Sequence, residues 1–127
     1  MAPSYAFVRS PGLTRMLISP VMTAETLVVL CTCPDEGVAA DLAHQIVAEG
    51  LAACVNRFGG LTSVYKWEGE MREGTEIQLV IKTSAAALEP LIERLQTLHP
   101  YELPEIIAVP ISAGHGPYLD WIRTVTS

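Results

Sequence analysis

The chain has 127 residues, half of them hydrophobic, which is the size of one domain with a buried core. Its 8 basic and 14 acidic residues give a formal net charge of −6, which argues against nucleic acid or an anionic membrane surface as a partner. No apolar run approaches the roughly 20 residues of a membrane span, and three irregularly spaced cysteines do not match a secreted disulfide framework, so we expect a cytoplasmic protein.

Residues 1–24 differ in composition from the rest of the chain. They hold three prolines and two arginines, and no carboxylate precedes Glu25. The apolar run of a secretion signal is missing from them. We therefore expect an N-terminal extension over residues 1–24, outside the core, and a folded domain over residues 25–127.

An apolar run of strand length, residues 26–32, opens the expected domain. Such a run is typical of a central strand that is covered on both faces. Pro34 ends this strand, and Asp35 is placed to cap the helix that follows. Apolar residues at helical spacing predict that helix over residues 38–48, and Gly50 suits its C-terminal end.

A long β-hairpin is the central element of the predicted fold. Residues 62–67 and 76–82 each alternate between two faces, and the polar, glycine-containing segment between them suits a loop. If the first arm begins at Ala53, it extends on the order of 50 Å, beyond the roughly 35 Å diameter of a domain of this size. The arm must then bend, at Gly59 and Gly60, or project and find a partner for its edge.

A strongly amphipathic segment predicts a second helix that ends before Pro100. Pro90 lacks a backbone N–H and fits only the first turn of a helix. This places the start of the helix near Ala87 or Leu88.

Residues 106–111 predict a fourth strand, and Pro110 indicates an edge position for it. A short helix over residues 117–125 completes the chain. The order is then β-α-β-β-α-β with a C-terminal helix. This is the ferredoxin-like, split β-α-β plan of the α+β class, with an antiparallel sheet, a long central hairpin and both main helices on one face.

No strong catalytic or phosphate-binding motif is present. Cys31 and Cys33 are two positions apart on a strand, so their sulfurs project from one face, and thiolates bind soft metals. A free cysteine is also commonly a small buried hydrophobe, which is the preferred interpretation of Cys33 and Cys54. For Cys31 the two interpretations have equal weight.

Three other groups of residues are candidate sites. The proline-stiffened loop over residues 99–105 can preorganise ligands, although a plain connector is the simpler interpretation. The aromatic residues of the hairpin and of the last helix can line a pocket, but packing is favoured. The acidic residues of the hairpin are interpreted as a solvated loop face: Glu68, Glu70, Glu73 and Glu76.

Five separated blocks, in the right order, resemble the CutA family, which is named for divalent-cation tolerance. The blocks are residues 29–36, 51–55, 65–69, 81–83 and 99–105. The resemblance runs from about Leu27 to the end of the chain. It implies a ferredoxin-like homotrimer whose long hairpins pair between subunits, similar in fold and assembly to the PII signalling proteins. It also implies a role in copper tolerance and no settled enzymatic activity.

In the pattern of that family, copper is bound by a strand-end cysteine and by two adjacent histidines before Pro-Tyr. The cysteine matches Cys31 and the second histidine matches His99, but Leu98 stands where the first histidine is expected. The metal ligands implied are thus Cys31 and His99, with Cys33 as a substitute only if it lies near both. We expect weak binding of copper or another divalent metal, and no organic cofactor.

The expected function is that of a trimeric, metal-binding protein in divalent-cation tolerance, not an enzyme. An alternative is a PII-like sensor with a small molecule in a cleft between subunits, lined by Trp67, Tyr101, Glu102 and Trp121. A third possibility, an enzyme with Cys31 as nucleophile and His99 as base, ranks below both because no set of oxyanion donors is visible.

Overall fold

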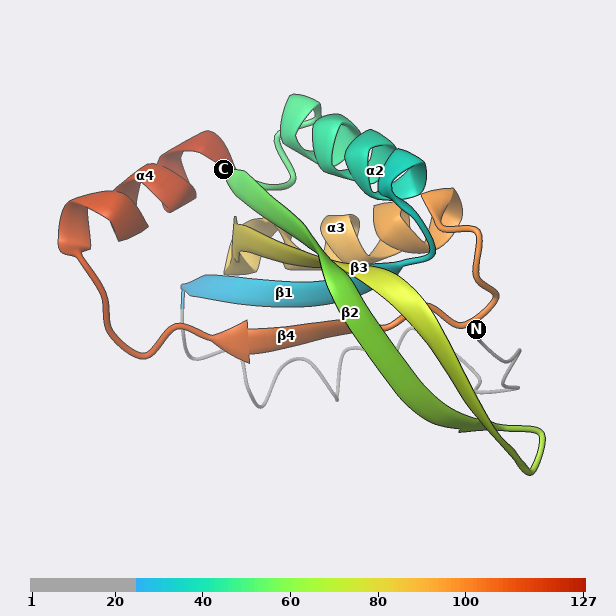
Figure 1. The fold of residues 1–127 in the computed structure, drawn as a ribbon. Helices are drawn as coiled ribbons and strands as arrows, with labels where there is room; N and C mark the ends of the chain where they lie inside the picture. The colour runs from blue at the N-terminus through green and yellow to red at the C-terminus, as the bar shows by residue number, and fades with distance from the viewer. Residues whose placement is uncertain (1–24) are drawn as a thin grey trace.

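The computed structural model describes residues 25–127, so the extension predicted over residues 1–24 lies outside the described residues. The elements are β1 (Thr26–Cys33), α2 (Glu36–Ala48), β2 (Cys54–Trp67), β3 (Glu70–Ser84), α3 (Ala85–Leu98), β4 (Ile106–Pro110) and α4 (Gly116–Val125). The strands form one antiparallel sheet in the order β2-β3-β1-β4 (Figure 1). The predicted α+β, ferredoxin-like fold is confirmed, including the edge position of β4.

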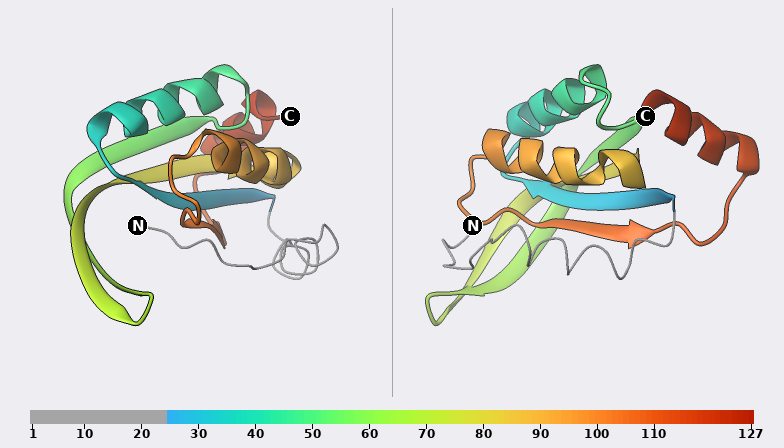
Figure 2. Two further views of the ribbon diagram at one scale, coloured as in Figure 1. Left: turned by 90° about the vertical axis from the view of Figure 1, so that its right-hand side faces the viewer. Right: turned by 180° about the vertical axis from the view of Figure 1, so that it is seen from behind.

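The core lies between the sheet and the helices α2 and α3, which cover the same face of the sheet (Figure 2). Alternate residues of β1 point into this layer because side chains of a strand alternate between its faces. The fully buried side chains of that row are Leu27, Val29, Cys31 and Cys33. The two neighbouring cysteines are therefore part of the packed layer, at the end of the central strand β1.

No helix among residues 25–127 covers the opposite face of the sheet. Leu30 pairs with Val80 on one side and with Ile107 on the other, so all three share this face. Ile107 is 51% exposed, and so is Phe58, which pairs with the neighbouring strand β3 on the same face. An exposed apolar sheet face of this kind marks an interaction surface.

The β2–β3 hairpin both bends and projects. Its register shifts between Phe58 and Leu61, where Gly60 has a φ of +79°, and its far half extends beyond the helices in both figures. The loop is shorter than the sequence indicated, because Glu68 and Gly69, both at positive φ, close a two-residue turn and β3 begins directly after it. The projecting arms therefore present unpaired strand edges to solvent.

Helix α3 begins earlier than the sequence predicted. Ser84 caps it by accepting a hydrogen bond from the backbone N–H of Ala87 at 3.4 Å, and the helix starts at Ala85. The expected start near Ala87 is therefore wrong, and Pro90 lies in the second turn. Because Pro90 has no backbone N–H, the carbonyl of Ala86 lacks its helical hydrogen-bond donor. Both residues are exposed, so water can donate a hydrogen bond to that carbonyl.

Helix α4 follows the edge strand β4 and buries Ile122. The tilted rings of Tyr118 and Trp121 are in contact on this helix, with centroids 5.4 Å apart, and both side chains are exposed. None of the described helices has the length and apolar character needed to cross a membrane.

Candidate metal centre

Cys31, Cys33 and His99 meet within a single chain. The two Sγ atoms and a ring nitrogen of His99 all lie within 4.8 Å of one another. Both cysteines are fully buried and His99 is 7% exposed. Strand β1 holds the cysteines rigidly, because it pairs with β3 along its length and with β4 as far as Cys31.

His99 reaches β1 because the helix that precedes it stops at this residue. Pro100 disfavours helical backbone at the preceding position, and His99 adopts an extended conformation with a ψ of 138°. Its Nε2 lies 2.8 Å from the carbonyl oxygen of Thr32, and its Nδ1 accepts a hydrogen bond from the backbone N–H of Tyr101 at 3.1 Å. A carbonyl only accepts and an amide N–H only donates, so the proton of the neutral ring is on Nε2.

Glu76 is buried beside this cluster and connects the hairpin to the loop after α3. Its carboxylate is 4% exposed and accepts hydrogen bonds from Ser63 Oγ at 2.6 Å and from Tyr101 Oη at 2.8 Å. The Tyr101 ring in turn contacts that of His99, with centroids 4.6 Å apart. The interpretation of Glu76 as part of a solvated face is wrong, because Glu76 is buried and its carboxylate is paired with two hydroxyl groups. Both hydroxyl groups come from segments distant in the sequence.

The two thiols differ in acidity. The pKa of Cys33 is lowered, first because the thiol of Cys31 donates a hydrogen bond to it; burial acts in the opposite direction, and a hydrogen bond with the nearby His99 side chain lowers the pKa further. The pKa of Cys31 is raised by that same hydrogen bond, by burial and by the negative charges around it. The pair therefore loses its first proton from Cys33. A buried thiolate next to a second thiol is a ligand pair for a soft metal.

Two further groups near the cluster keep their protons more tightly than usual. Burial and the hydrogen bond to Glu76 raise the pKa of Tyr101, so its phenol remains a donor. Burial raises the pKa of Glu105, and the charge of Glu76 adds to the effect. The surroundings of the thiols are thus rich in negative charge.

Glu105 gives a pH-dependent prediction. Its pKa is raised in the folded chain, so the folded state binds this proton more tightly than the unfolded state does, and the ionised carboxylate opposes folding at neutral pH. We expect Glu105→Gln to increase the free energy of unfolding at pH 7. This gain in stability should shrink as the pH falls through the raised pKa of Glu105. It should vanish below the ordinary value of 4.5, where Glu105 of the wild type is protonated in both the folded and the unfolded state.

Urea unfolding at a series of pH values measures this effect. Glu102→Gln is the matched control, because Glu102 is an exposed carboxylate of the same loop. A loss of stability in Glu105→Gln at pH 7 would contradict the prediction.

The four residues expected to line a cleft do not converge within one chain. Tyr101 and Glu102 follow His99 and Pro100 in the loop next to the thiol cluster. Trp67 ends β2 near the tip of the hairpin, and Trp121 is on α4, at the other end of the molecule in both figures. A cleft that uses all four would require more than one subunit.

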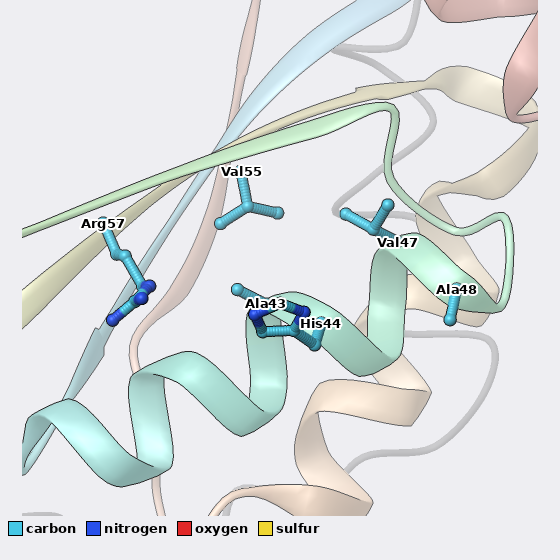
Figure 3. A pocket seen from close by; sticks show the side chains of 6 residues that line it. All are labelled: Ala43, His44, Val47, Ala48, Val55 and Arg57. Carbon is cyan, nitrogen blue, oxygen red and sulfur yellow. The ribbon is translucent and has the colours of Figure 1, made fainter.

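A separate cavity of about 410 Å³ lies between α2 and the start of β2 (Figure 3). Its lining is Ala43, His44, Val47, Ala48, Val55 and Arg57. Arg57 is engaged in an ion pair with Glu36 at 2.7 Å. None of the six lining residues is a cysteine or a carboxylate, so the cavity adds no ligand to the thiol cluster.

The fold and the cluster define a class of protein: a ferredoxin-like domain with two thiols and an imidazole buried together at the end of its central strand, a group that could hold a metal ion. The sequence profile of the family described as "CutA1 divalent ion tolerance protein" matches residues 27–125. The chain belongs to this family, and the resemblance noted in the sequence is confirmed. The family is named for tolerance of divalent cations rather than for a reaction.

Individual relatives agree with this assignment. The divalent-cation tolerance protein CutA of Thermus thermophilus is 52% identical over 99 residues, which are 78% of this chain and 96% of the relative. The crystal structure of CutA from Xylella fastidiosa, 43% identical, matches with a TM-score of 0.80 over 82% of this chain and 100% of its own. The periplasmic divalent cation tolerance protein CutA of Archaeoglobus fulgidus, 30% identical, matches with a TM-score of 0.78 over 80% and 99%.

Proposed function

We propose that this protein is a homotrimer that binds copper or a similar ion in divalent-cation tolerance. The observation that carries the proposal is the meeting of Cys31, Cys33 and His99 within one chain. Cys31 and His99 match the ligand positions that the family resemblance implies, and Cys33 lies within 4.8 Å of both. Thiolate and imidazole groups are ligands that copper accepts.

The trimer in this proposal is supported by two surfaces. The sheet face that carries Leu30, Val80 and Ile107 has no cover from the described part of the chain. The hairpin also presents Val64, 60% exposed, and Met71, 71% exposed, on arms that extend beyond the domain. Closed cyclic assembly covers such faces and edges on every subunit at once.

The cytoplasm is the compartment we propose. All three cysteines are free in the structure, and a reducing compartment keeps thiols available as ligands. The periplasmic location in the name of the Archaeoglobus fulgidus relative belongs to that protein. Cell fractionation of the native protein tests this part of the proposal.

A competitive titration tests metal binding. The purified full chain is titrated with copper against a chelator, next to Cys31→Ser and Cys54→Ser. We expect the affinity to fall at least about 10-fold in Cys31→Ser, because a thiolate ligand is lost. Cys54→Ser is the control, since Cys54 is a free cysteine outside the cluster, and it should bind as wild type does. Equal affinity in all three proteins would place the metal elsewhere.

A further inference from the structure

We propose that the thiol pair of Cys31 and Cys33 is the complete ligand set for a soft, two-coordinate ion such as Cu(I), and that His99 is a positioning residue rather than a ligand. This inference rests on the proposed function, because it assumes that metal binds at this cluster. It differs from the ligand set that the family resemblance implies, in which His99 takes part and Cys33 does not.

The first argument is the separation of the two sulfurs. A bond between a thiolate sulfur and a metal such as zinc is about 2.3 Å long, so two such bonds in a line span about 4.6 Å. The two Sγ atoms lie within 4.8 Å of each other. The two sulfurs are thus close enough for one ion to contact both, and the pairing of β1 with its neighbouring strands holds that strand in place.

The second argument is that His99 has no free nitrogen. Nε2 donates its proton to the carbonyl of Thr32, and Nδ1 accepts the N–H of Tyr101. A metal bound to either nitrogen would break one of these hydrogen bonds. The carbonyl of Thr32 or the N–H of Tyr101 would then be left without its partner at a buried position, and this costs free energy. The two bonds instead tie the start of loop 99–105 to β1 over the sulfurs.

The third argument concerns the class of ion. Structural zinc sites use four ligands, and harder divalent ions prefer oxygen. The nearby carboxylate of Glu76 already accepts two hydrogen bonds, from Ser63 and Tyr101. Two buried thiolates on one strand therefore favour a soft cation that sulfur alone can satisfy, and the negative charge of Glu76 and Glu105 nearby also favours a cation.

The experiment uses the full-length protein, with Cu(I) alone and Zn(II) alone as probes. Affinities are measured by chelator competition for wild type, Cys33→Ser and His99→Gln. Glutamine keeps an N–H donor for the Thr32 carbonyl, so it is the conservative change at His99. We expect the Cu(I) affinity to fall about 100-fold or more in Cys33→Ser, to stay within about 3-fold of wild type in His99→Gln, and to exceed the Zn(II) affinity in wild type.

X-ray absorption at the copper edge of loaded wild type gives a readout that does not depend on how the variants fold. Two sulfur neighbours and no nitrogen support the proposal, and a nitrogen neighbour overturns it. An equal loss of affinity in His99→Gln and Cys33→Ser, or tighter binding of Zn(II) than of Cu(I), also overturns it. Absence of any metal binding by wild type would instead remove the proposed function itself.

Discussion

Glu76→Ala is expected to lower the free energy of unfolding by about 3 kcal/mol. The substitution removes a buried carboxylate that accepts two short hydrogen bonds, and it leaves the hydroxyl groups of Ser63 and Tyr101 without their acceptor. Hydrogen bonds to charged groups are worth about 1.5–3 kcal/mol each, and unpaired buried donors add a desolvation cost. Denaturant unfolding, monitored by tryptophan fluorescence, measures the loss.

Two controls isolate the origin of this effect. Glu73→Ala removes an exposed carboxylate of the same strand and should change the stability by less than about 0.5 kcal/mol. A double-mutant cycle with Tyr101→Phe should give a coupling energy of about 1 kcal/mol or more between Glu76 and Tyr101. A loss below about 1 kcal/mol in Glu76→Ala would mean that the network connecting the hairpin to loop 99–105 does not stabilise the fold.

The order of the elements was predictable because each of them has a local signal. The apolar run of β1, the alternation along the hairpin and the helical spacing before Pro100 each operate over a few residues. The N-cap at Asp35 shows the same, since its side chain accepts the N–H of Val38 at 2.9 Å, as the sequence suggested. Local signals of this kind are enough to predict the fold class, even where the predicted end of an element differs by a few residues from the structure.

The burial of Glu76 was not predictable because it depends on contacts across the chain. Glu76 lies in a hairpin rich in charged residues, and nothing in its neighbourhood indicates that Ser63 and Tyr101 close over it. The start of α3 differs from the prediction for a local reason: Ser84 caps the helix by accepting the N–H of Ala87, and the exposed Pro90 is tolerated in the second turn. The partners of Glu76, in contrast, come together only after the strands and the loop 99–105 have packed.

The candidate site was partly predictable. The i, i+2 spacing of Cys31 and Cys33 on one strand placed both sulfurs on one face, and the structure shows this. Their approach to His99 within the same chain was not predictable, because it depends on where α3 ends relative to β1. The occupation of both ring nitrogens by backbone groups is likewise a consequence of tertiary packing alone.

Ile107→Asp is expected to dissociate the proposed trimer into monomers. Ile107 is 51% exposed on the sheet face without helices, next to Leu30, and is expected to be buried between subunits. Full burial of an isoleucine contributes about 2 kcal/mol, and at 51% exposure about half of that is still to be gained on assembly. Its loss in three subunits therefore removes about 3 kcal/mol, or roughly 100-fold in the association constant. The charge of aspartate adds a further desolvation cost.

Sedimentation equilibrium at micromolar concentration should show the mass of three chains for wild type and of one chain for Ile107→Asp. Val47→Asp is the matched control, because Val47 is similarly exposed, at 41%, but is on helix α2, on the other side of the sheet. Trimer formation stabilises folded chains by mass action, so Ile107→Asp should also melt at a lower temperature that no longer rises with protein concentration. A trimeric Ile107→Asp, or a wild-type monomer, would show that this apolar face is not the surface on which the subunits assemble.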